Sequence, residues 1–151
     1  MPVKTDVTPA LENYLEAIYI LQKVKDPVKV MDIARYLDVK MPSVTYNMKK
    51  LETRDLILYE KRSHVELTPA GEEMARGVHR RHEDFFRFFH YILGVPKALA
   101  DEDACRVEHV LHSETVDRLT RFMQWVAALP EDRSFRASKA SAGRTGRKII
   151  K

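Results

Sequence analysis

The chain has 151 residues, 44% of them hydrophobic, and a formal net charge of +4, which suits one compact core or two small domains. No segment approaches the roughly 18 uninterrupted apolar residues of a membrane helix, and residues 1–6 lack the apolar core of a signal peptide. We therefore expect a cytoplasmic protein with no membrane partner. The single cysteine, Cys105, excludes an internal disulfide.

Three helices are predicted at the start of the chain. Thr8-Pro9 is a helix start, because Thr accepts a hydrogen bond from an orphan backbone N–H and Pro has no N–H to lose there. Apolar residues then recur with helical periodicity to about residue 25. A second helix is predicted for about residues 30–37 and, after a tight turn, a third for about residues 42–53. Two short helices joined by a few residues are typical of a helix-turn-helix.

A hairpin and further helices are predicted next. Strand-like runs at residues 56–61 and 64–68 flank Arg62-Ser63, which predicts a two-stranded wing with a basic tip. Thr68-Pro69 repeats the helix-start signal and opens a long helix of about 25 residues, ended by Gly94 and Pro96. Two more helices are predicted at about residues 101–112 and 114–129. The predicted fold class is mainly α, an N-terminal winged helix-turn-helix followed by a C-terminal helical domain.

The domain boundaries are predicted from these elements. We assign residues 1–72 to the winged helix-turn-helix, 73–130 to the helical domain and 131–151 to a flexible basic tail. The tail holds seven Lys or Arg residues against two acidic ones, with too little apolar surface to offset the entropy of folding. It either contacts phosphates nonspecifically or is a solvated end without a role.

The third predicted helix has the character of a DNA-reading helix. Its apolar positions, Val44, Met48 and Leu51, leave other faces for hydroxyl and lysine side chains that reach base edges and phosphates in the major groove. Residues 40–62 carry six basic against three acidic side chains, which favours DNA over the alternative of a protein-interaction module. The candidate DNA-binding residues are Pro42, Ser43, Thr45, Tyr46, Lys49, Lys50 and Arg62.

A second cluster brings metal-binding side chains together. Cys105, Glu108 and His109 stand at i, i+3 and i+4, so a helix projects them from one face. A thiolate, a carboxylate and an imidazole make a partial shell for a first-row transition ion, which His82 and Glu16 are candidates to complete. The alternatives are a packed cysteine, a hydrogen-bonded core histidine and a surface glutamate.

Several segments together resemble the diphtheria-toxin-repressor family of iron- or manganese-dependent repressors, which includes the manganese transport regulators. They are residues 11–19, 30–51, 67–71, 81–82 and 103–111. The resemblance covers about residues 6–129. Without the SH3-like third domain of the iron-type members, the chain is similar in architecture to the shorter manganese-type branch.

The resemblance implies that Glu16, His82, Glu108 and His109 bind metal. It places Cys105 at a position that is Cys in iron-type members and Glu in many manganese-type ones.

Three positions depart from the family pattern. Asn13 stands where the family has Met or Asp, and it offers a carbonyl oxygen without a charge. Phe86 and Asp101 stand where iron-type members have an ancillary carboxylate and a histidine. Their second metal site is therefore not reproduced as such.

The expected cofactor is Fe2+ or Mn2+. A thiolate from Cys105 favours Fe2+, whereas Glu16, His82, Glu108 and the two-domain length favour Mn2+, and we lean towards Fe2+. Co2+, Ni2+ or Zn2+ are expected to bind in vitro, since raw affinity follows the Irving–Williams order.

The predicted function is a metal-dependent transcriptional repressor of metal-homeostasis genes. An ion joining ligands of the first helix and the later helices shifts the population towards the form in which the DNA-binding domain is held against the dimerisation domain. The two recognition helices of a homodimer then fit a near-palindromic double-stranded operator. Residues 85–89 and Trp125 are either dimer interface or core. The alternative is a metal-independent winged-helix regulator that uses the helical domain only to dimerise. Without a zincin motif, nucleophile elbow or Gly-rich phosphate loop, we expect neither an enzyme nor a small-molecule substrate.

Overall fold

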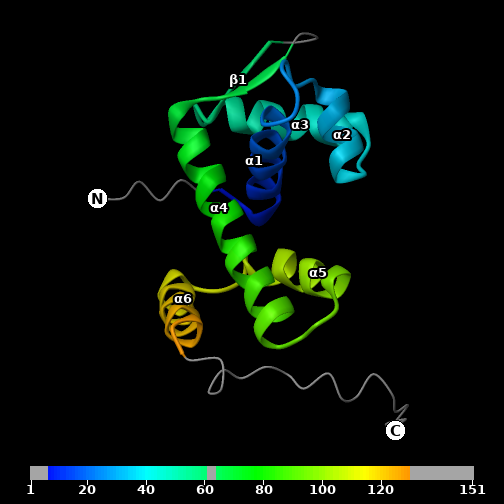
Figure 1. Ribbon diagram of the computed structural model, residues 1–151. Coiled ribbons are helices and arrows are strands. Elements are labelled where there is room, and N and C mark those ends of the chain that lie inside the picture. Colours follow the sequence, from blue (N-terminus) through cyan, green and yellow to red (C-terminus); the bar gives the residue numbers. More distant parts are fainter. Residues whose placement is uncertain (1–6, 61–63, 130–151) are drawn as a thin grey trace, which may run out of the picture. The chain divides into compact units, whose positions relative to one another are not determined.

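The computed structural model describes residues 7–60 and 64–129, and its contacts divide the chain into two compact units, residues 1–81 and 82–151. We describe each unit by itself. In the described ranges, no helix has the length and apolar character needed to cross a membrane. The elements, labelled in Figure 1 where space allows, are α1 (Pro9–Gln22), α2 (Val30–Leu37), α3 (Met41–Glu52), β1 (Ile57–Tyr59), β2 (Val65–Leu67), α4 (Pro69–Arg87), the π-helix η1 (Phe88–Ile92), α5 (Lys97–Val107) and α6 (Ser113–Ala127).

Helix α1 is the centre of the first unit. Its start follows the predicted signal, with the Thr8 hydroxyl accepting a hydrogen bond from the Leu11 N–H at 3.4 Å and Pro9 at the first helical position. The apolar face of α1 packs against α2, α3 and β2 in one hydrophobic core. The strands pair antiparallel with Ile57 opposite Leu67, and Val28 adds a bridge to Val65. The winged helix-turn-helix prediction is confirmed.

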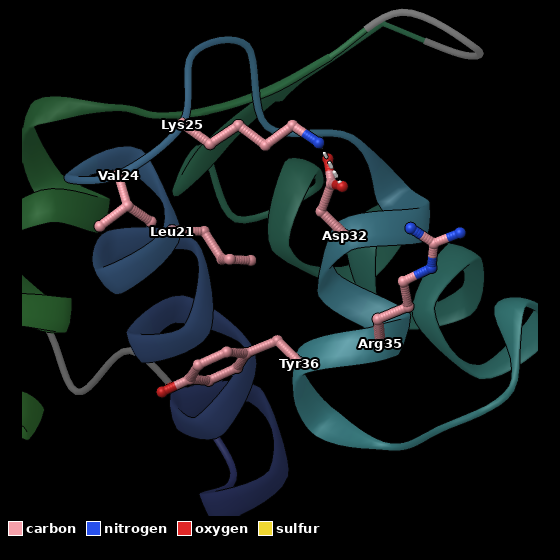
Figure 2. A pocket seen from close by; sticks show the side chains of 6 residues that line it. All are labelled: Leu21, Val24, Lys25, Asp32, Arg35 and Tyr36. Carbon is pink, nitrogen blue, oxygen red and sulfur yellow. Dashed lines mark hydrogen bonds and ion pairs between the residues drawn. The ribbon is translucent and has the colours of Figure 1, made fainter.

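The corner between α1 and α2 is held by Asp32. Its carboxylate accepts a hydrogen bond from the Lys29 N–H at 2.9 Å, which caps the start of α2, and forms an ion pair with Lys25 (Figure 2). The hydrogen bond from Lys25 and that from the Lys29 backbone outweigh burial and hold the pKa of Asp32 below its usual value. Helix α1 ends at Gln22, before the predicted end near residue 25, and the chain turns after Lys23.

The turn between α2 and α3 depends on Asp38. This residue adopts a left-handed conformation, with φ of 52°, and Val39 donates its N–H to the Ala34 carbonyl at 3.0 Å. An aspartate tolerates this conformation better than a branched residue does. The structure thus has the predicted tight turn at residues 38–40, and α3 begins directly after it.

The second unit contains the end of α4, η1, α5 and α6 around a smaller core of Phe85, Ala104 and Val116. The predicted helix at residues 101–112 was wrong at both ends, because α5 spans Lys97–Val107. Pro96 is the N-cap, with a φ of −52° and a ψ of 141° that are not helical, so the helix begins directly after it, and Glu108 is the C-cap. Glu108 still has right-handed helical backbone angles. The metal-binding side chains around it can therefore cluster as predicted, although α5 ends earlier than predicted.

Gly71 marks the closest approach between α4 and the start of the hairpin. A Cβ atom on Gly71 would lie 1.9 Å from the carbonyl oxygen of Leu56, whereas a Cβ on Gly77 meets nothing within 4 Å in the described chain. The Leu56 carbonyl is also fixed by a 3.1 Å hydrogen bond from the Thr68 N–H. The first turn of α4 can therefore contact this backbone only because residue 71 has no side chain.

Replacing Gly71 by Ala is expected to lower the free energy of unfolding by about 3 kcal/mol, because a backbone carbonyl must move. Gly77→Ala is the matched control and should raise it by about 0.5–1 kcal/mol, since alanine loses less entropy in a helix. Urea denaturation followed by circular dichroism measures both. Equal effects of the two substitutions would contradict the close approach.

Candidate metal centre and nucleic-acid surface

A buried carboxylate is the central feature of the second unit. Glu108 is 2% exposed. Among the described residues, it is the one charged residue that is buried together with the hydrophobic core. Glu108 directly follows the last residue of α5. The small side chains of Ala100 and Ala104 are buried, and they allow α5 to pack closely within the unit. A charge removed from water is costly unless other charges or an ion offset it.

Two imidazoles flank the Glu108 carboxylate. Nε2 of His109 lies 3.0 Å from Oε1, and Nδ1 of His82 lies 3.3 Å from Oε2. Although these are ion-pair distances, neither Glu108 oxygen has hydrogen-bond geometry with any group in the described part of the chain. The nitrogens are therefore near the carboxylate without pointing hydrogen atoms along its lone pairs.

This arrangement fits a bound cation. Two ligand atoms that each lie about 2.1 Å from one ion are about 3.0 Å apart at right angles and about 3.4 Å apart at the tetrahedral angle. The Glu108 contacts with the two histidines match that spacing. Ligand atoms of Cys105, Glu108 and His109 also lie within 4.8 Å of one another. Imidazole, carboxylate and thiolate together suit a first-row transition ion.

The histidines also keep Glu108 ionised. Burial raises the pKa of this carboxyl, but the neighbouring imidazoles of His109 and then His82 outweigh burial, so the pKa lies below its usual value. Glu108 is therefore a carboxylate, the form that binds metal, at neutral pH. Cys105 is exposed, which leaves its sulfur accessible to an ion or an oxidant.

The other predicted ligands lie in the first unit. Glu16 and Asn13 are partly buried on α1. The Glu16 carboxylate is hydrogen-bonded to Nδ1 of His79, 3.0 Å away, and the His79 ring lies against that of Tyr19. Sequence reasoning left His79 outside the site, since nothing in a single helix pattern names a partner 63 residues away.

Asp101 was expected from the sequence either to face solvent or to lie beside the ligands without binding metal. Its Oδ1 lies 3.0 Å from Nε2 of His82, in hydrogen-bond geometry. Asp101, Cys105 and Glu108 follow the spacing i, i+4, i+7, a helical stripe that could have found it. Phe86, in contrast, packs against the second core and stacks on His90, with ring centroids 5.4 Å apart.

The exposed side of α3 carries most of the predicted DNA-binding residues. Val44, Met48 and Leu51 are buried, as predicted. A shallow hollow of about 440 Å³ is lined by Met41, Pro42, Thr45, Tyr46 and Lys49.

Three of the candidates on α3, Ser43, Tyr46 and Lys50, have further contacts within the first unit. The Lys50 ammonium lies over the Tyr46 ring, 4.3 Å from its centroid, and the Ser43 hydroxyl is 3.0 Å from the Tyr14 hydroxyl. Tyr46 and Lys50 therefore form a cation–π pair on the surface of α3. Arg62 lies outside the described residues.

The groove between α1 and α2 contains none of the predicted site residues. It measures about 440 Å³, and Figure 2 shows Leu21, Val24 and Tyr36 along its apolar side. Lys25, Asp32 and Arg35 complete its lining, with the first two joined in the ion pair described above.

Two family models match the chain. The N-terminal DNA binding domain of the iron dependent repressors matches residues 6–65, and their metal binding and dimerisation domain matches residues 68–133. The chain belongs to the iron-dependent repressor family. This repressor is therefore a metal-dependent, DNA-binding transcription regulator and not an enzyme, and the metal-independent alternative is not favoured.

Curated relatives agree with this membership. The transcriptional regulator MntR of Bacillus pumilus is 35% identical over 118 residues, which cover 78% of the repressor and 81% of the relative. An uncharacterized HTH-type transcriptional regulator of Methanocaldococcus jannaschii is 34% identical over 119 residues, covering 78% and 95%.

Solved structures give the same result. The manganese regulator SloR matches with a TM-score of 0.68 and 30% identity over 76% of the repressor and 54% of that chain. The repressor thus spans about half the length of this structure. A hypothetical protein of Sulfolobus solfataricus, at 21% identity and a TM-score of 0.58, shares the fold over 77% of the repressor and 88% of that chain.

Lys49→Ala is expected to weaken DNA binding about equally for all sequences and to lower the slope of log affinity against log salt by about 1, because one phosphate contact is lost. Lys23→Ala is the control, since Lys23 lies at the end of α1 over the Tyr19 ring and its loss changes net charge equally. A fluorescence-anisotropy salt titration measures both slopes. Identical slopes for the wild type and Lys49→Ala would exclude the phosphate contact.

Proposed function

We propose that this protein represses metal-homeostasis genes when Fe2+ or Mn2+ binds to His82, Cys105, Glu108 and His109. The observation that supports it best is the buried Glu108 carboxylate, which lies 3.0 and 3.3 Å from two imidazole nitrogens without hydrogen bonds to its oxygens. A bound cation would stabilise such a cluster, because it would offset the buried negative charge of Glu108. Glu16 and Asn13 of α1 remain predicted ligands.

The proposed mechanism is thermodynamic linkage between metal and DNA. An ion that binds the DNA-competent form more tightly than other forms shifts the population towards it, and DNA must then tighten metal binding by the same factor. The operator is proposed to be a near-palindromic site in double-stranded DNA, and α3 of each subunit of a homodimer is proposed to read it. The protein is proposed to act in the cytoplasm. We also propose that residues 1–72 form the DNA-binding domain, residues 73–130 the metal-binding and dimerisation domain, and residues 131–151 a basic tail.

The dimer surface is proposed to lie on α6. Phe122 and Trp125 are 47% and 59% exposed, their rings are 5.9 Å apart, and Phe88 meets Phe122 edge-on at 6.4 Å. Exposed aromatic rings in contact with one another are typical of interface centres. Phe85, also a candidate for the interface, is buried in the core of the second unit.

Glu108→Ala is expected to abolish the metal-dependent gain in DNA affinity and to weaken metal binding by about 100-fold or more, because the central ligand is lost. Glu102→Ala is the matched control, an exposed α5 carboxylate paired with Arg106. Metal competition against a fluorescent chelator and DNA anisotropy with and without metal provide the measurements. Wild-type protein that binds DNA equally in both conditions would refute the sensing mechanism.

The metal proposed as physiological is Fe2+, because Cys105 supplies a soft thiolate beside the carboxylate and imidazoles. Cys105→Glu is expected to raise the affinity for Mn2+ relative to Co2+, a stable substitute for Fe2+, by about tenfold. Cys105→Ser is the control, which removes the thiolate without adding a carboxylate. Relative affinities that stay constant in all three proteins would remove the reason for preferring iron.

A further inference from the structure

The His82 ring lies between two carboxylates of different character. On one side, Asp101 Oδ1 is 3.0 Å from Nε2 in hydrogen-bond geometry, and the Asp101 side chain is 67% exposed. On the other side, Glu108 Oε2 is 3.3 Å from Nδ1, and the Glu108 side chain is fully buried. The ring itself is 18% exposed, so it separates a solvated carboxylate from a buried one.

The hydrogen bond to Asp101 determines which nitrogen of His82 carries the hydrogen. A carboxylate only accepts hydrogen bonds, so Nε2 must be the N–H that donates to Asp101. In the neutral imidazole, Nδ1 then has a lone pair, directed at the side where Glu108 lies. A cation bound to that lone pair places positive charge beside the buried Glu108 carboxylate, as a hydrogen on Nδ1 otherwise does.

We propose that Asp101 is a positioning residue for the metal site. It accepts the Nε2 hydrogen of His82, holds the ring in place and leaves Nδ1 as the atom that binds the ion. Asp101 itself stays outside the coordination sphere. This inference rests on the proposed metal-binding function, and it gives a specific role to an aspartate that stands where iron-type members of the family have a histidine.

The local structure explains how the Asp101 side chain reaches His82. Asp101 lies directly after Ala100, which with Ala104 is fully buried and brings α5 close to its neighbours in the second unit. A short side chain therefore reaches His82. The adjacent Glu102 is engaged with Arg106 on the exposed face of the helix. A carboxylate behind a metal-bound imidazole raises the basicity of the ligand and restrains its rotation.

Nuclear magnetic resonance of full-length protein with ¹⁵N-labelled histidine, loaded with ¹¹³Cd2+, tests the assignment directly. The expected result is scalar coupling of cadmium to Nδ1 of His82, with Nε2 still bearing its hydrogen. The His82→Ala spectrum assigns the signals. Coupling to Nε2, or no coupling to His82, would overturn the proposal.

Metal affinity tests the energetic contribution. Asp101→Ala is expected to weaken Zn2+ binding by about 10- to 100-fold, and Asp101→Asn, which keeps an acceptor oxygen, to recover most of that loss. Glu102→Gln, which removes one negative charge from the same helix, should leave the affinity unchanged. In a His82→Ala background, Asp101→Ala should have no further effect.

The outcomes separate the two proposals. If Glu108→Ala leaves Zn2+ affinity unchanged, the metal site itself is wrong. If Glu108→Ala abolishes binding while Asp101→Ala matches the wild type, the site stands and the role of Asp101 is refuted. An equal loss for Asp101→Ala and Glu102→Gln would reduce Asp101 to a general charge effect and also refute its positioning role.

Discussion

The removal of one charge from water constrains the second unit more than any other feature. Glu108 is buried with the aromatic and aliphatic core, and its carboxylate is stabilised by histidines from α4 and from its own turn. Hydrophobic packing of α5, through two buried alanines, holds the carboxylate in place. The same packing that stabilises the unit thus places a buried negative charge where positive charge must offset it, which is the physical basis of the proposed metal centre.

The first unit is organised differently, by apolar burial and by polar contacts between helices. Leu15, Ile18 and Ile33 are fully buried, whereas Glu12 and Glu16 of α1 contact Arg81 and His79 of α4 at the edge of the core. The apolar core fixes the orientation of α3, so the residues opposite Val44 and Met48 are exposed for contact with a ligand. The proposed recognition of DNA by α3 therefore depends on buried side chains that hold the helix in place and make no contact with DNA themselves.

Periodicity and turn chemistry were enough to predict the helix-turn-helix, the hairpin and the long α4, because each signal is local. Thr8-Pro9 and Thr68-Pro69 mark α1 and α4, and Asp38 adopts the left-handed turn conformation. The start of α5 was missed because Pro96 caps it without a polar side chain. The partners of His79 and His82 were missed for another reason. A hydrogen bond between residues on different helices depends on helix packing, which a single sequence does not encode locally.

The contact between Gly71 and Leu56 has a mechanical consequence. With the helix backbone seated against a carbonyl that is itself hydrogen-bonded to Thr68, the first turn of α4 has no room to slide along the start of the hairpin. The start of the hairpin is therefore expected to follow the first turn of α4 when that turn moves, and residue 71 is the position at which a side chain would disturb both.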